Sequence, residues 1–295
     1  MFEVLGIPSQ ALFGQLLIGL INGSFYALLS LGLAVIFGML NIINFSHGAQ
    51  YMLGAFTAFF LLQYGGLGYW WALVLAPVLV GTLGIVIERL FLRWLYQLDH
   101  LYGLLLTFGL ALIIEGTFRN FFGSSGLPYS VPSELTGGRD LGFMFLPNYR
   151  AWVVLFSLAV CLTTWFIIER TKLGSYLRAA TENPALVRAF GINVPRMITL
   201  TYGFGVALAA LAGVMAAPIY NVSPQMGANL IIVVFAVVVI GGMGSIMGAI
   251  VTGFGLGVIE GLTKVFFPEA SNTVIFIIMA VVLLIRPAGL FGRRA

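Results

Sequence analysis

Charged residues are scarce in this chain of 295 residues. Asp, Glu, Lys and Arg make up only 8% of the sequence, against a hydrophobic share of 60% and a mean hydropathy of +1.06. Soluble domains carry about 25% charged residues. A soluble fold of this length could not keep so much apolar surface away from water. The composition therefore excludes an ordinary soluble protein and predicts a protein embedded in membrane lipid.

Residue types that carry catalysis are also rare. The single cysteine, Cys161, permits no disulfide framework within the chain. The two lysines, Lys172 and Lys264, each follow a threonine, whereas a phosphate-binding loop needs Gly-Lys-[Ser/Thr]. The two histidines, His47 and His100, are too few for a zinc site. No nucleophile–base pair or carboxylate dyad can be assembled, so we expect neither an enzyme nor a cofactor in this chain.

Long apolar runs fill most of the sequence. A membrane-spanning helix needs about 20 such residues, and runs such as 230–240 are apolar on every face, whereas strands of a membrane barrel alternate. We therefore predict an all-α fold, a polytopic transmembrane bundle of about nine helices (range eight to ten) in a single domain, 1–295. The first run is either one tilted helix or two short ones. The expected segments are 11–40, 50–64, 70–95, 101–122, 151–169, 198–220, 229–242, 246–263 and 273–286.

Basic residues set the expected orientation, because Lys and Arg concentrate in cytoplasmic loops. Placing 89–100, 170–196 and the C-terminus in the cytoplasm puts ten of the fourteen Lys and Arg residues there. Residues 123–150 then form an extracytoplasmic loop, and nine crossings leave the N-terminus outside. The formal net charge of +4 thus reflects topology, and we expect no nucleic-acid partner.

Small residues recur at every fourth position in two segments. Gly253, Gly257 and Gly261 form one series, and positions 205, 209, 213 and 217 form another. Residues four apart share one face of a helix, and small side chains there let two helix backbones approach closely in lipid. We expect these faces to pack helix against helix.

Two segments, 41–48 and 241–245, interrupt apolar runs with small or polar residues. Unwound backbone at membrane depth is tolerated where it faces protein or a wet cavity, and paired breaks can mark a transport site. The alternative is that the polar groups satisfy the broken backbone or pack helices together. The candidate pathway residues are Asn22, Asn44, Ser46, His47, Gly241, Gly242 and Gly244.

Residues 170–196 contain the signals of a short helix. Asn183 is a good helix cap, Pro184 suits the first helical position, and Gly191 is a natural stop. A helix of about 10 Å can neither span a membrane nor be stable alone. It is either a connector held by neighbouring helices or an element that docks against a partner. We expect one of its sides to carry Leu186, Val187 and Phe190.

The same segment resembles a known family. Gly174-Ser175-Tyr176-Leu177-Arg178-Ala179, Glu182-Asn183-Pro184 and Ala189-Phe190-Gly191-Ile192 are similar to the cytoplasmic signature of branched-chain amino acid ABC permeases. Further similar motifs lie at 41–48, 52–55, 241–249 and 286–292. The resemblance covers nearly the whole chain in the right order, and it is nearest to the LivH-type subunit.

The resemblance implies that 174–191 holds a coupling helix that seats in a separate ATPase subunit. It also implies a second related permease subunit, two ABC ATPase subunits that bind the ATP, an extracytoplasmic substrate-binding protein and a bacterial inner membrane. The transported solute would be a branched-chain amino acid or a related small molecule. The residues implied in coupling are Gly174, Arg178, Ala179, Glu182, Asn183, Pro184, Leu186, Phe190 and Gly191.

Two other functions are alternatives. A secondary transporter driven by an ion gradient needs ionisable groups in mid-membrane. However, Glu115 and Glu260 each have a basic residue four positions on, where helical neighbours pair. Glu88 lies beside Arg89 at the end of a run, so we interpret all three carboxylates as anchors at the membrane interface. A passive channel or membrane scaffold has no use for a capped cytoplasmic helix.

Overall fold

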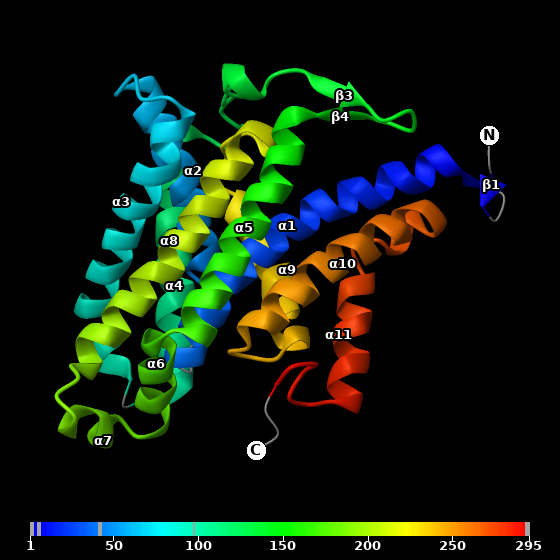
Figure 1. Cartoon of the computed structure of the whole chain (residues 1–295). Helices are drawn as coiled ribbons and strands as arrows, with labels where there is room; N and C mark the ends of the chain where they lie inside the picture. Colours follow the sequence, from blue (N-terminus) through cyan, green and yellow to red (C-terminus); the bar gives the residue numbers. More distant parts are fainter. Residues whose placement is uncertain (1–2, 5–6, 41–42, 97, 293–295) are drawn as a thin grey trace.

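The computed structural model describes residues 3–4, 7–40, 43–96 and 98–292. Within these ranges the chain is a bundle of helices (Figure 1). Nine of them coincide with the nine expected apolar segments. They are α1 (Ser9–Leu40), α2 (His47–Gln63), α3 (Tyr69–Leu90), α4 (His100–Phe122), α5 (Asn148–Arg170), α8 (Val194–Tyr220), α9 (Met226–Gly241), α10 (Ile246–Phe266) and α11 (Val274–Ile285).

Six of these helices are long and apolar enough to cross a membrane, judged by length and composition: α1, α3, α4, α5, α8 and α10. The helices α2, α9 and α11 have only 17, 16 and 12 residues. At 1.5 Å per residue even α2 reaches about 26 Å, less than the ~30 Å hydrocarbon core. The first run forms one continuous helix of 32 residues, which settles that alternative.

Short elements lie at the two ends of the bundle. The strands β3 (Gly138–Asp140) and β4 (Phe145–Pro147) form an antiparallel hairpin in the loop between α4 and α5. This hairpin lies at the end of the bundle opposite α6 (Lys172–Glu182) and α7 (Pro184–Ala189) (Figure 1). The sequence did not predict strands. The remaining elements are β1 (Glu3–Val4), β2 (Ile7–Pro8) and the 3-10 helices η1 (Leu92–Leu95), η2 (Ser133–Leu135) and η3 (Pro268–Ala270).

The helix α1 runs through the centre of the bundle. In the most apolar 18-residue stretch of α1, 83% of the residues are buried, against 11% in α4. Close packing along α1 depends on glycine: a Cβ on Gly257 of α10 would lie 2.3 Å from the Cα of Gly23. The expected small-residue face of α10 is thus confirmed as a helix-packing face.

The bundle contains two units of similar build. Each has a long helix, a short helix and a helix of full length: α1, α2 and α3 in the first unit, and α8, α9 and α10 in the second. The first helix of each unit packs against the third helix of the other. The two short helices meet at Gly48 and Gly227, where a Cβ on Gly227 would lie 1.9 Å from the carbonyl oxygen of Gly48.

Candidate functional site

The helix α6 folds back against the end of α5. Only Thr171 separates the two helices, and a Cβ on Gly174 would lie 1.6 Å from the carbonyl oxygen of Ile168. Gly174 is therefore needed for this turn. Leu177 is buried beside it. The helix α6 was not predicted from the sequence as a separate helix, although Leu173, Leu177 and Ala180 recur at helical spacing.

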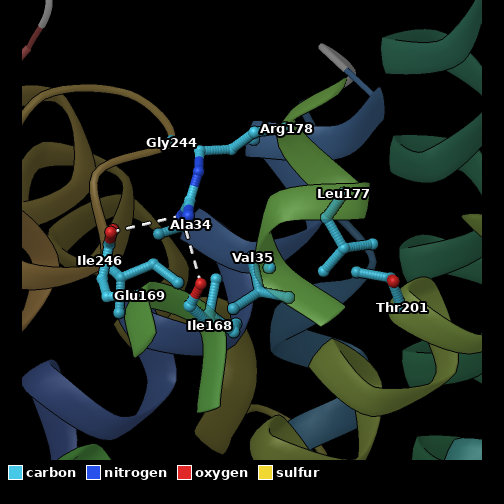
Figure 2. Close-up of a pocket in the computed structure, with 11 residues that line it drawn as sticks. Ala34, Val35, Ile168, Glu169, Leu177, Arg178, Thr201, Gly244 and Ile246 are labelled. Carbon is cyan, nitrogen blue, oxygen red and sulfur yellow. Dashed lines mark hydrogen bonds and ion pairs between the residues drawn. The ribbon is translucent and has the colours of Figure 1, made fainter. Parts of the chain in front are cut away.

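Arg178 fastens α6 to α5. Its Nη1 donates to the carbonyl oxygen of Ile168 at 3.1 Å and to Oε2 of Glu169 at 3.2 Å (Figure 2). The carbonyls in the last turn of a helix have no partner within that helix, and a basic side chain there is favourable. Arg178 thus holds α6 against the end of a long apolar helix.

The helix α7 begins and ends where the sequence predicts. The Oδ1 atom of Asn183 accepts a hydrogen bond from the backbone N–H of Leu186 at 3.0 Å, and Pro184 occupies the first turn. Gly191 has a φ of +81°, a left-handed conformation that favours glycine. The helix ends at Ala189, so Phe190 is its C-cap.

The expected apolar side of α7 is wrong in one respect. Val187 is buried and packs with Ala180 and Val194, the latter in the first turn of α8. Leu186 and Phe190 instead point outward, with 54% and 76% of their surface exposed. Successive helical residues lie about 100° apart, so Leu186 and Val187 face different ways. The implied coupling residues Ala179, Glu182, Asn183 and Pro184 are also exposed.

Two adjoining cavities open beside this segment. A cavity of about 80 Å³ lies between the end of α1, the end of α5, α6 and the residues around Gly244 (Figure 2). A second cavity of about 390 Å³ shares Glu169, Arg178 and Gly244 with it, and also touches Phe291 and Gly292 of the C-terminal tail. The segment 170–196 therefore borders the same space as two of the other sequence motifs.

The glycine segment 241–245 is a turn between two helices. The helix α9 ends at Gly241 and α10 begins at Ile246, while Gly242 and Gly244 have φ values of +101° and +81°. The C-terminal tail binds to this turn: the N–H of Leu290 donates to the carbonyl of Ile240 at 2.8 Å, and the N–H of Phe291 donates to that of Gly241 at 3.0 Å. The glycines stay candidate pathway residues.

The other broken segment contains a buried network of hydrogen bonds. Residues 41–42 lie outside the described part of the chain. The Oδ1 atom of Asn44 accepts from the N–H of Ser46 at 3.1 Å and from its Oγ at 2.5 Å. The amides of Asn44 and Gln50 each donate to the hydroxyl of Tyr202 at 3.2 Å. Each of these side chains is at most 1% exposed, an arrangement that favours the backbone-satisfying alternative.

His47 shows that α2 begins inside the bundle. Its Nε2 lies 3.0 Å from the carbonyl oxygen of Leu29, and its ring fits against Gly32. Leu29 lies eleven residues before the end of α1, a distance of about 16 Å along the helix. The chain therefore returns into the bundle between α1 and α2 before the second helix starts.

Several neighbours of this network were not foreseen from the sequence. Thr107 of α4 accepts from the N–H of Phe45 at 3.2 Å and donates to the carbonyl of Ile43 at 3.2 Å. Tyr202 and Gln50 were also missed. The available signal was Gln50 itself, an amide at the start of an apolar segment. Asn22 lies apart from this group and accepts from the hydroxyl of Tyr220 at 2.9 Å, which joins α1 to α8.

The carboxylates are held in two ways. The pairs Glu115–Arg119 and Glu260–Lys264 form as predicted, each with an N–O distance of 2.5 Å. Glu88 and Glu260 differ from the expected interface anchors because both are buried. Glu88 accepts from the hydroxyls of Tyr96 and Thr199, both at 2.7 Å, and Glu260 also accepts from the hydroxyl of Tyr26 at 2.6 Å. Among the described residues, no group of three or more His, Cys, Asp or Glu side chains could hold a metal ion.

Comparison with known proteins agrees with this architecture. Residues 15–283 match the family described as "Branched-chain amino acid transport system / permease component". The chain is 31% identical over 298 residues to the high-affinity branched-chain amino acid transport system permease protein LivH of Escherichia coli (strain K12), with 95% of each chain covered. It is 32% identical over 292 residues to BraD, the corresponding permease protein of Pseudomonas aeruginosa, again with 95% of each covered.

A more distant relative is the permease protein LivM of Escherichia coli (strain K12), which is 28% identical over 291 residues that cover 90% of this chain and 67% of LivM. No solved structure matches this chain. The family match extends over nearly all of the apolar helices, and relatives above 30% identity cover almost the whole sequence. The chain therefore belongs to the family of branched-chain amino acid transport permeases, and it is a multi-pass membrane transport protein rather than an enzyme.

Proposed function

We propose that this chain is one of two permease subunits of an ATP-driven importer of branched-chain amino acids, or related small apolar solutes, in a bacterial inner membrane. The names of the relatives LivH and BraD support the solute. This chain is related both to LivH and to LivM. This supports a second, related permease as its partner. An extracytoplasmic binding protein delivers the solute, and two ATPase subunits bind ATP.

The exposed apolar pair Leu186 and Phe190 on α7 carries the proposal. A short helix at a membrane surface gains nothing from exposing two large apolar side chains to water, since burying each contributes roughly 1.5–3 kcal/mol. Val187 holds the other side of α7 against α6 and α8. Leu186 and Phe190 thus form a docking surface for a partner subunit, while the opposite side of α7 stays packed on the permease.

The contacts of α6 and α7 define how a movement of α7 reaches the membrane helices. Val187 transmits force to Val194 at the start of α8, and Arg178 transmits it to the end of α5. Both helices border the smaller of the two cavities beside α6. ATP binding in the partner subunits moves α7, and the ends of α5 and α8 follow, which opens or closes the pathway.

The test is uptake of leucine into proteoliposomes that contain the two permeases, the ATPase subunits and the binding protein. We expect the double variant Leu186→Ser/Phe190→Ser to lose the ATPase subunits on purification and to lose at least nine-tenths of ATP-dependent uptake. The matched control is Arg188→Gln, an exposed change on the same helix, which should retain both. ATP-independent uptake by the permease chain alone, abolished by an ionophore, would instead favour an ion-driven transporter.

A further inference from the structure

A third cavity, of about 210 Å³, lies between α2, α4 and α9, away from the coupling segment. Its walls are mainly apolar: Phe45 precedes α2, Phe108 and Leu112 come from α4, and Ile231 and Ile232 come from α9. Pockets for drug-sized ligands have volumes of roughly 300–1,000 Å³. A smaller apolar pocket suits a smaller molecule with an aliphatic or aromatic side chain.

The cavity lies where the short helices of the two units meet. The paired residues Gly48-Ala49 of α2 and Gly227-Ala228 of α9 all line it. The N-cap residues of these two helices, Ser46 and Gln225, make no side-chain cap hydrogen bond. Lipid cannot satisfy the backbone N–H groups of a first helical turn, so this wall faces protein or water.

One ionisable side chain borders the cavity among the described residues that line it, the carboxylate of Glu115. Its side chain is 16% exposed and pairs with Arg119, which is 49% exposed. Ionisable residues within membrane helices face bundle interiors or wet cavities rather than lipid. This carboxylate places a polar group at the edge of otherwise apolar walls.

We propose that this cavity receives the apolar side chain of the transported amino acid. The proposal rests on the proposed function and specifies where the solute contacts this subunit. The apolar walls take the side chain, while Glu115 lies within reach of the ammonium group. The open side, which carries the exposed residues Leu112 and Ile232, faces the second permease, so the pathway runs between the two subunits.

The test fills the cavity without touching the coupling segment. Ala111 lines the cavity on α4, and Ala111→Phe should lower the rate of ATP-dependent leucine uptake at least tenfold when loaded binding protein is in excess. Gly109→Phe is the matched control, because Gly109 does not line the cavity and a Cβ there meets nothing within 4 Å. It should stay within twofold of the wild type.

A second variant covers the case in which Ala111→Phe does not assemble. Ile232→Ala removes a side chain from the exposed rim and should raise the ratio of phenylalanine to leucine uptake at least threefold. If the wild-type complex transports leucine but neither variant changes the rate of uptake or the preference between phenylalanine and leucine, the inference on the cavity is overturned. The proposed function then still stands. If the wild-type complex shows no ATP-dependent uptake, the proposed function is overturned and the inference with it.

Discussion

The hydroxyl of Tyr202 closes the buried network at the start of α2. It accepts hydrogen bonds from the amides of Asn44 and Gln50, and all three side chains are almost fully buried. An unpaired buried donor costs about 1–3 kcal/mol. The network thus depends on the hydroxyl oxygen of Tyr202 in α8, whereas the two amides that donate to it lie at or just before the start of α2.

Tyr202→Phe should therefore lower the midpoint of thermal unfolding in detergent by several degrees, because it leaves one N–H of each amide unpaired. Tyr102→Phe makes the same chemical change at a residue that is 56% exposed and should leave the midpoint unchanged. A Tyr202→Phe protein of unaltered stability but reduced leucine uptake would instead favour a role for Asn44 and Ser46 in the pathway.

Single glycines also decide where the chain can turn. A Cβ on Gly174 would overlap the carbonyl oxygen of Ile168, which is backbone and cannot swing aside. No other residue type permits α6 to follow α5 after a single connecting residue. The position of α7 therefore depends on Gly174 of α6, which has no Cβ.

At the scale of elements, the sequence predicted those positions and ends of helices that a single local signal determines. The apolar runs located nine helices, and Asn183 and Gly191 fixed both ends of α7. The sequence did not reveal which side of α7 is buried, because Val187 packs on residues of α6 and α8 that only the fold brings together. Glu88 was misplaced for a similar reason, since its partner Thr199 lies 111 residues further along the chain.

The pairing of α2 with α9 was also beyond prediction from the runs alone. The sequence shows two breaks, at 41–48 and 241–245, that could form a pair, whereas in the structure α2 meets α9 at Gly48 and Gly227. A faint signal exists: Asn44-Phe45-Ser46 precedes α2, Asn221-Val222-Ser223 precedes α9, and a Gly-Ala pair follows each. The candidate pathway residues therefore stay predictions, whereas the elements that carry them are established.

The C-terminal tail is an element without secondary structure that is held by glycines. A Cβ on Gly242 would lie 2.5 Å from the backbone nitrogen of Gly292, and its φ of +101° disfavours any other residue. We expect Gly242→Ala to loosen the tail, so that the amides of Leu290 and Phe291 exchange hydrogen at least tenfold faster. Gly66→Ala is the control, because Gly66 also has a positive φ but open space around it.

Amide exchange followed by mass spectrometry would measure both variants. Unchanged protection of the tail in Gly242→Ala would mean that the two hydrogen bonds to the last turn of α9 do not hold it. In that case the tail would not count as part of the wall of the cavity that it shares with Arg178.

At the scale of the whole molecule, the helices imply an orientation in the membrane. The hairpin of β3 and β4 and the segment of α6 and α7 lie at opposite ends of the bundle (Figure 1). The positive-inside rule predicts that the second end lies in the cytoplasm. The one natural cysteine, Cys161, is buried, so engineered cysteines can be read without removing it.

We expect Ser133→Cys, in the loop between α4 and α5, to react with a membrane-impermeant maleimide in intact cells. Ser175→Cys, an exposed position on α6, should react only after the membrane is broken. Labelling is measured by the mass shift on a gel, with the natural sequence as the blank. The reverse pattern would invert the topology and put α7 out of reach of any cytoplasmic ATPase.

The seam between α1 and α10 sets a limit on how the subunit changes shape. Along it the backbones touch directly, at Gly23 against Gly257 and at Ala27 against Gly253. Where main chain meets main chain there are no rotamers to rearrange, so the two helices cannot slide past one another without losing contact. We expect them to tilt together as one unit, so that the hinges of any conformational cycle lie outside this seam.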